Sequence, residues 1–128
     1  MPQPGRRRFE VRVDLAFQAA HNLRQYRGLT EPLHGHSWKV EVFISGLPDH
    51  EGLVIDFVEV QSALRRIVEP LDYHYINDVV PFDQINPTAE NIAAWIFNQL
   101  DPLVSTESRR LEKVTVWEGK RAAASCLR

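Results

Sequence analysis

Two segments of alternating hydrophobicity, each with histidine at one end, constrain the fold of this chain more than any other feature. From residue 9 the odd positions are apolar up to His21, and from residue 34 the even positions are His34 and His36, followed by apolar residues up to Ile44. Side chains of a strand alternate between its two faces, so each segment is predicted to be a strand with one buried face. The three histidines share that face. Because a buried imidazole without a partner is costly, we expect them to share one partner.

The spacing of these histidines favours a zinc site. In the His-Gly-His motif at 34–36 both rings project from one strand face, and His21 would arrive from the neighbouring strand. Three neutral imidazoles leave a fourth tetrahedral position open, as in catalytic zinc sites, where the ion acts as a Lewis acid. The alternative is that they are ordinary core or loop histidines with protein partners. A cupin-like set of His34, His36 and Glu41 fits less well, because Glu41 falls on the opposite strand face.

Composition is that of an ordinary globular protein. The chain has 128 residues, of which 44% are hydrophobic and 25% charged, enough for one small core. Its net charge of −2 gives no reason to expect nucleic acid or a membrane as partner, and no segment is long and apolar enough to span a bilayer. The one cysteine, Cys126, excludes an intrachain disulfide and a cysteine-based zinc site and favours a cytoplasmic location. We expect residues 1–7 to be a mobile tail and residues 8–128 to be one domain.

The rest of the sequence predicts two helices between two hairpins. Asp56 and Thr88 are each expected to cap a helix, since each precedes apolar residues at helical spacing. Residues 74–87 are expected to be irregular. Strands are expected at 8–20, 34–46, 110–118 and 121–127. The order ββααββ predicts an α+β domain, a four-stranded antiparallel sheet with two helices on one face, whose free edges favour self-association.

Six short stretches occur along the chain in a characteristic order. They are FQAAH (17–21), LHGHSWKVEV (33–42), VIDF (54–57), EPLDYHYIND (69–78), NPTAEN (86–91) and VTVWEG (114–119). Together they resemble the 6-pyruvoyl-tetrahydropterin synthase and 6-carboxy-tetrahydropterin synthase family. The resemblance implies the T-fold, barrel-forming oligomers that are homohexamers of two trimers, and an active site between subunits.

The resemblance also implies roles for individual residues. It implies that zinc is held by His21, His34 and His36. It implies that Glu118 anchors a pterin ring, with help from the segment from Thr88 to Glu90. The carboxylate suits this role, because a pterin presents a ring N–H and an exocyclic amine side by side, and a carboxylate accepts from both.

This chain departs from the family pattern at two positions that carry catalytic residues in the family. The cysteine that the family has four residues before the His-Gly-His motif is Thr30 here, a far poorer base. The next residue, Glu31, matches a subgroup with glutamate three residues before that motif, so we expect Glu31 to be the general base. The family's Asp-His pair is Asp72-Tyr73 in this chain, and we expect Tyr73 or His74 to transfer the second proton, oriented by Asp72.

These expectations describe a zinc-dependent lyase. The glutamate subgroup cleaves the side chain of 7,8-dihydroneopterin to give 6-hydroxymethyl-dihydropterin for folate biosynthesis. One alternative is a 6-pyruvoyl- or 6-carboxy-tetrahydropterin synthase acting on dihydroneopterin triphosphate, with Arg24 and Arg27 as candidate phosphate ligands. Another alternative is a zinc- and pterin-binding homologue without activity, which the absence of both the usual cysteine and the usual histidine favours.

Overall fold

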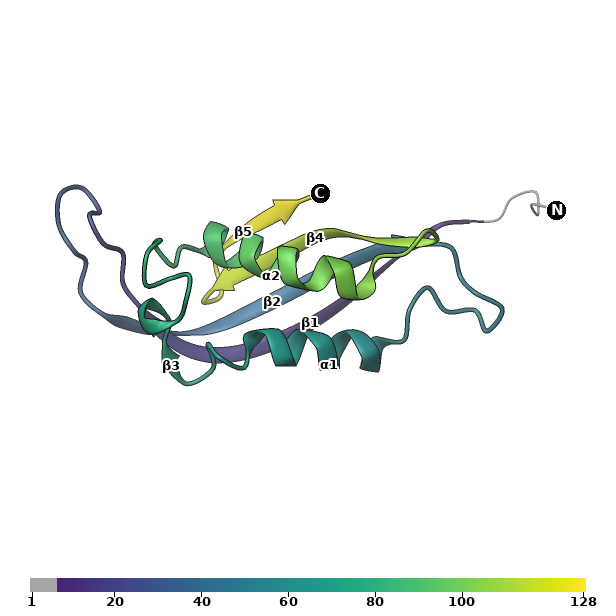
Figure 1. The fold of residues 1–128 in the computed structure, drawn as a ribbon, viewed down its shortest axis with the longest axis horizontal. Helices are drawn as coiled ribbons and strands as arrows, with labels where there is room; N and C mark the ends of the chain where they lie inside the picture. Colours follow the sequence, from purple (N-terminus) through teal and green to yellow (C-terminus); the bar gives the residue numbers. More distant parts are fainter. Residues whose placement is uncertain (1–6) are drawn as a thin grey trace.

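The computed structural model of the chain describes residues 7–128 (Figure 1). Its elements are, in order, β1 (Phe9–His21), β2 (His34–Gly46), α1 (Phe57–Val68), β3 (His74–Tyr75), the 3-10 helix η1 (Ile76–Asp78), α2 (Ala89–Val104), β4 (Arg109–Glu118) and β5 (Ala122–Leu127). The strands form one sheet in the order β3-β1-β2-β4-β5. Residues 1–6 of the predicted tail lie outside the described residues.

The two long strands pair antiparallel, as predicted, with their apolar positions on the same face of the sheet. β1 and β2 are antiparallel, with His21 opposite His34 and Ala19 opposite His36. Buried and exposed positions alternate along both strands, and Trp38 is fully buried beside the histidines. β2 also pairs with β4, with Trp38 opposite Glu118. This pairing brings the histidine ends of β1 and β2 and the carboxyl end of β4 to the same end of the sheet.

Two helices cover one face of this sheet (Figure 1). The predicted caps are confirmed: Asp56 accepts a hydrogen bond from the Val58 N–H, and Thr88 accepts one from the Asn91 N–H. Each helix buries one apolar stripe in the core. The stripes comprise Val60, Leu64, Ile67 and Val68 of α1 and Ile92, Ile96, Phe97 and Leu100 of α2. Neither helix, nor any other within residues 7–128, has the length and hydropathy needed to cross a membrane.

A short fifth strand extends the predicted sheet. β3 runs parallel to β1, with His74 opposite Ala19 and Tyr75 opposite Ala20, and η1 follows it directly. The prediction that residues 74–87 are irregular is therefore wrong at the start of this segment. Two residues are too few to show an alternation of hydrophobicity, so the sequence contains no pattern from which this strand follows. The strand places the preceding residues, Asp72 and Tyr73, at the edge of β1.

The sheet face away from the helices is charged, as the alternation predicts. Arg12 reaches Asp14 at 2.6 Å and Glu41 at 2.8 Å across β1 and β2. The indole N–H of Trp117, on β4, donates to Glu41 as well. Both α1 and α2 lie on the opposite face of the sheet.

Candidate metal and substrate site

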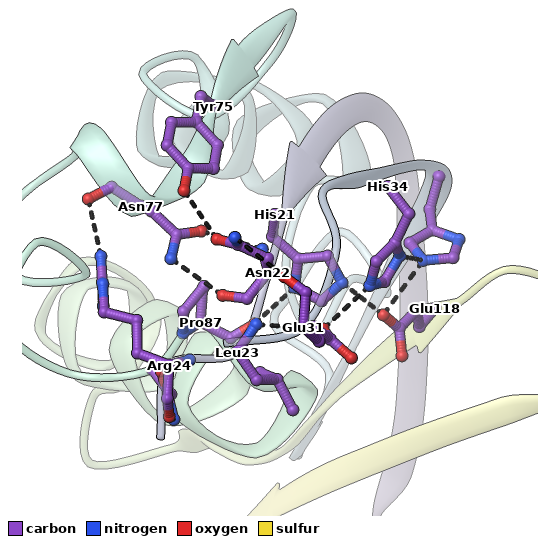
Figure 2. Close-up of polar contacts among 12 residues, drawn as sticks. His21, Asn22, Leu23, Arg24, Glu31, His34, Tyr75, Asn77, Pro87 and Glu118 are labelled. Atoms are coloured by element: carbon purple, nitrogen blue, oxygen red, sulfur yellow. Dashed lines mark hydrogen bonds and ion pairs between the residues drawn. The ribbon is translucent and has the colours of Figure 1, made fainter. Parts of the chain in front are cut away.

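Four potential metal ligands meet where β1, β2 and β4 come together (Figure 2). They are His21, His34, His36 and Glu118, and one ligand atom from each lies within 4.8 Å of the others. His21 Nε2 is 2.5 Å and His36 Nε2 is 3.2 Å from Glu118 Oε1. His34 Nδ1 is 2.5 Å from His36 Nε2. The strand pairings hold these groups together, so the cluster is a consequence of the sheet rather than of a loop conformation.

The tautomer of His21 makes this cluster suitable for a metal ion. His21 Nδ1 lies 2.8 Å from the carbonyl oxygen of Pro87, to which it donates, so the proton of the neutral ring resides on Nδ1. His21 Nε2 is buried and has no hydrogen-bond partner among the described residues, although Glu118 Oε1 is close. Two acceptors at such a distance repel unless a proton or cation lies between them. A backbone carbonyl behind a ligating imidazole is also the usual arrangement in metal sites.

The protonation state of His36 also makes the cluster suitable for a metal ion. Burial lowers the pKa of His36, and the neighbouring His34 and His21 act in the same direction against the opposing charge of Glu118. The ring is therefore neutral at neutral pH, which is the form that binds a metal ion. Three imidazoles and a carboxylate are a donor set that zinc accepts.

Glu31 lies directly beside the cluster. Its Oε1 is 2.9 Å from His34 Nε2 and accepts a hydrogen bond of 3.0 Å from the Leu23 N–H. The contact with His34 is the main cause that lowers the pKa of Glu31, with the Leu23 N–H as a further cause. The carboxylate is therefore ionised at neutral pH, as a group that must accept a proton has to be.

A cavity of about 300 Å³ opens next to the cluster. It is lined by His21, Leu23, Glu31, His34, Thr88, Ala89, Glu90 and Glu118. Thr88 and Glu90 reach it from the N-terminal end of α2, which Thr88 caps. One cavity thus gathers two metal ligands, the predicted base and all the predicted substrate-binding residues.

The predicted proton donors, Tyr73 and His74, lie outside the cavity that contains Glu31. Asp72 Oδ1 accepts a hydrogen bond of 2.9 Å from the Gln18 N–H on β1. Tyr73 is 82% exposed and has a left-handed backbone (φ 59°). Tyr73 and His74 line a separate cavity of about 470 Å³, which His36 also borders. Within one chain, the predicted base and the predicted proton donors therefore do not share a cavity.

The family of the chain follows from its sequence over nearly the whole length. A family model described as 6-pyruvoyl tetrahydropterin synthase matches residues 10–128. The chain belongs to the 6-pyruvoyl tetrahydropterin synthase family. Membership makes it a pterin-processing enzyme, and the elements described above are those of the T-fold of this family.

Individual relatives carry different names. A 6-carboxy-5,6,7,8-tetrahydropterin synthase of Synechocystis is 35% identical over 69% of this chain and 71% of that protein. A dihydroneopterin monophosphate aldolase of Pyrococcus furiosus is 32% identical over 81% of this chain and 84% of that protein. A solved structure of 6-pyruvoyltetrahydropterin synthase from Plasmodium vivax, in a variant whose catalytic glutamate is replaced by alanine, has a TM-score of 0.80 at 23% identity, covering 95% of this chain and 98% of that one. This last likeness establishes the shared fold.

The hydrogen bonds between polar loop residues near the cluster could not be predicted from sequence patterns. Asn22 and Asn77 hydrogen-bond reciprocally through backbone and side chain, and so do Arg24 and Asn86. The Arg24 guanidinium donates to the carbonyl oxygens of Asn77 and Phe82 at 3.1 and 2.7 Å. It is therefore occupied inside the fold, which argues against its predicted alternative role as a phosphate ligand. Loop polar residues have no periodicity, so only the fold reveals these pairs.

Proposed function

We propose that the chain is a zinc-dependent lyase that cleaves the side chain of dihydroneopterin to give 6-hydroxymethyl-dihydropterin. The observation that supports this most is the position of Glu31, 2.9 Å from His34 and in the wall of the cavity beside the cluster. Thr30 stands where the family pattern has a cysteine, so Glu31 is the group suited to remove a proton. The Plasmodium vivax enzyme, whose catalytic residue is a glutamate by its description, supports the same choice.

In this proposal zinc is held by His21, His34 and His36, with Glu118 beside them. Zinc supplies Lewis acidity that lowers the pKa of a hydroxyl bound to it. The chain contributes the orientation of the ligands: the Pro87 carbonyl holds the His21 ring in the tautomer that leaves Nε2 free.

The pterin ring is assigned to the carboxylates of the cavity. A carboxylate can accept from the ring N–H and the exocyclic amine together. Glu118 Oε1 lies beside His21 and His36 in this structure, and with these imidazoles bound to zinc both Glu118 oxygens would be available to the two donors of the ring. Glu90 lines the same cavity and, with Thr88, supports the ring from the end of α2.

The bond-breaking step balances with one proton removed and one returned. Glu31 takes the proton of the hydroxyl on the second side-chain carbon, whose oxygen then forms a carbonyl. The bond between the first and second side-chain carbons breaks, and its electron pair moves into the C=N bond of the dihydropterin ring. The first carbon then receives a proton, and the second and third carbons leave as a hydroxyaldehyde.

The returning proton is assigned to Tyr73 or His74, oriented by Asp72. These residues lie outside the cavity of their own chain, so we propose that they serve the site of a neighbouring subunit. The matching assembly is a homohexamer of two trimers, whose formation the charged uncovered sheet face and the free strand edges favour. Light scattering should then report six chains of 14.8 kDa. A cytoplasmic location is proposed from the single cysteine.

The phosphorylation state of the substrate separates this reaction from the nearest alternatives. Because relatives are named 6-carboxy-tetrahydropterin synthase and dihydroneopterin monophosphate aldolase, a phosphorylated substrate is an alternative for this chain. The cavity favours an unphosphorylated side chain, because Glu31, Glu90 and Glu118 line it and, among the described residues, no lysine or arginine does. Arg24 is occupied by backbone carbonyls.

The deciding experiment is product identification by mass spectrometry. Zinc-loaded protein is incubated separately with dihydroneopterin, its monophosphate and its triphosphate. We expect 6-hydroxymethyl-dihydropterin, formed fastest from the unphosphorylated substrate. A 6-pyruvoyl or 6-carboxy product from the triphosphate would establish the synthase alternative instead. Tight binding of dihydroneopterin without any product would establish the non-catalytic one.

The role of Glu31 is tested with the Glu31→Ala variant. Loss of a general base should lower kcat about 10²–10⁴-fold. Zinc content should be unchanged, because Glu31 is not one of the clustered ligands. Glu51→Ala is the matched control, since Glu51 is an exposed carboxylate in a turn. Full activity of Glu31→Ala would exclude Glu31 as the base.

A further inference from the structure

We propose that Asn22 is a positioning residue that fixes the carboxylate of Glu31 relative to the metal ligand His21, and that Tyr75 anchors the side-chain amide of Asn22 for this task. The inference rests on the proposed role of Glu31 as the base. It concerns residues that form neither the cluster nor the cavity wall. Asn22 follows His21 directly in the chain, at the point where β1 ends and the loop toward Glu31 begins.

The side chain of Asn22 joins two segments that are far apart in sequence (Figure 2). Its Nδ2 donates to the backbone carbonyl of Glu31 at 3.1 Å. Its Oδ1 accepts from the Tyr75 hydroxyl at 2.6 Å. The Glu31 carbonyl can only accept, so it requires the donor end of the amide, Nδ2, to face it. The Tyr75 hydroxyl then holds the acceptor end, Oδ1, in place.

The backbone of Asn22 is held from the other side by Asn77. The Asn22 N–H donates to Asn77 Oδ1 at 3.1 Å, and the Asn22 carbonyl accepts from Asn77 Nδ2 at 2.8 Å. Asn77 is only 3% exposed and lies in η1, which packs against the end of β1. Side-chain and backbone groups of Asn22 are therefore all hydrogen-bonded, so the residue has little freedom to tilt.

The next residue transmits this orientation to the carboxylate. The Leu23 N–H donates to Glu31 Oε1, and the Glu31 N–H donates to the Leu23 carbonyl, both at 3.0 Å. A rotation at Asn22 moves the Leu23 N–H and with it the bond to Oε1. Misplacement of a catalytic group by about 1 Å can cost about 10²-fold in rate. The positions of the metal ligands should not change, because the pairing of His21 with His34 in the sheet holds them independently of Asn22.

Two substitutions test the proposal. Tyr75→Phe removes the hydroxyl that anchors the amide, and Asn22→Asp removes the donor to Glu31 while keeping an acceptor for Tyr75. We expect kcat for the preferred neopterin to fall about tenfold in Tyr75→Phe and about a hundredfold in Asn22→Asp. KM and zinc content should stay within about twofold, since substrate binding and metal ligation are unchanged. The matched controls, Tyr26→Phe and Asn98→Asp, alter exposed positions and should behave as the parent protein.

Hydrogen exchange and a double variant separate positioning from a general structural role. Tyr75→Phe should speed exchange of the Leu23 and Glu31 amides. In a Glu31→Gln background it should change the residual rate less than about twofold, because no base remains to be positioned. An equal loss of kcat in both backgrounds, or unchanged amide exchange, would overturn the proposal. If Glu31→Gln alone is fully active, the proposed function fails instead, whereas parental activity of Tyr75→Phe beside an inactive Glu31→Gln defeats only the positioning role.

Discussion

Glu31 and Tyr73 lie near the same end of the sheet and differ in exposure and hydrogen bonding. The loop of Glu31 also contains left-handed residues, Gln25 and Arg27. Glu31 is hydrogen-bonded through its side chain and backbone, and its side chain is 25% exposed. Tyr73 is 82% exposed and has a left-handed backbone that L side chains adopt at a cost. Glu31 is held by hydrogen bonds within the chain, whereas the side chain of Tyr73 is exposed to solvent.

The two predicted parts of the site, the cavity beside the cluster and the segment Asp72–His74, are separate within one chain. Three of the four clustered ligands, the predicted base Glu31 and the predicted substrate-binding residue Glu90 line one cavity of a single chain. Tyr73 has strain without a compensating side-chain contact among the described residues. Left-handed non-glycine residues persist where the surroundings or a function require them. In the proposed homohexamer, a neighbouring subunit would supply the contacts that the Tyr73 side chain lacks in one chain.

Removal of a cluster ligand should have the largest effect. His21→Ala deletes the buried imidazole whose Nε2 points into the cluster, so we expect loss of activity and of most of the bound zinc. The segment Asp72–His74 should keep its exposure, because it touches β1 through Gln18 rather than through His21. Metal content by elemental analysis and activity are the measurements. His50→Ala is the control, since the His50 side chain is 88% exposed, and a parental zinc content in His21→Ala would contradict the site.

Mixing two inactive variants tests whether the two regions belong to different subunits. A Tyr73→Phe/His74→Ala variant should lose about 10²-fold in kcat through loss of the proton donor. When it is reassembled at equal amounts with Glu31→Gln, roughly a quarter of the sites should receive an intact base from one chain and an intact donor from another, and activity should return to that level. Activity that stays at the level of the separate variants would mean that base and donor act within one chain.

The parts of this site that the sequence predicts are those set by strand periodicity. The alternation in β1 and β2 places His21, His34 and His36 on one face of the sheet, because a shift of one residue would turn every apolar side chain outward. Proximity of Glu118 to His21 depends instead on the pairing of β2 with β4, which alternation alone does not specify. The family resemblance implies a role for Glu118 as a pterin ligand, and only the fold reveals that Glu118 also lies beside the histidines.

The surroundings of the base depend on contacts that no periodic pattern records. Asn22 and Asn77 are 55 residues apart, one just after β1 and the other in the three-residue η1, so their pairing emerges only from the fold. The same holds for β3, which is two residues long. Side-chain hydrogen bonds between loops are specified by the three-dimensional approach of the chain, whereas propensity and hydrophobic pattern report on helices and strands.

A smaller effect is expected from the residue that ties the loop to the segment after η1. Arg24→Lys replaces a planar fork of donors with a single ammonium, which cannot reach the carbonyls of Asn77, Phe82 and Ile85 together. We expect the free energy of unfolding to fall by about 1–3 kcal/mol, measured by urea denaturation. Arg27→Lys is the control, because Arg27 is exposed and lies over the Tyr26 ring. Equal stability of both variants would mean that this part of the loop is less firmly held than its hydrogen bonds indicate.

The smallest effect is a gain of stability at Tyr73. Glycine adopts a positive φ without the steric cost that a side chain incurs, so Tyr73→Gly should raise the free energy of unfolding by about 1 kcal/mol and Tm by a few degrees. If Tyr73 donates the proton, the same variant should lose about tenfold or more in kcat, and stability and activity would change in opposite directions. Thermal unfolding and turnover on the same preparation measure both. A stabilised variant with parental kcat would assign the proton transfer to His74, whereas a destabilised one would show that the Tyr73 side chain makes contacts in the assembled protein that outweigh its strain.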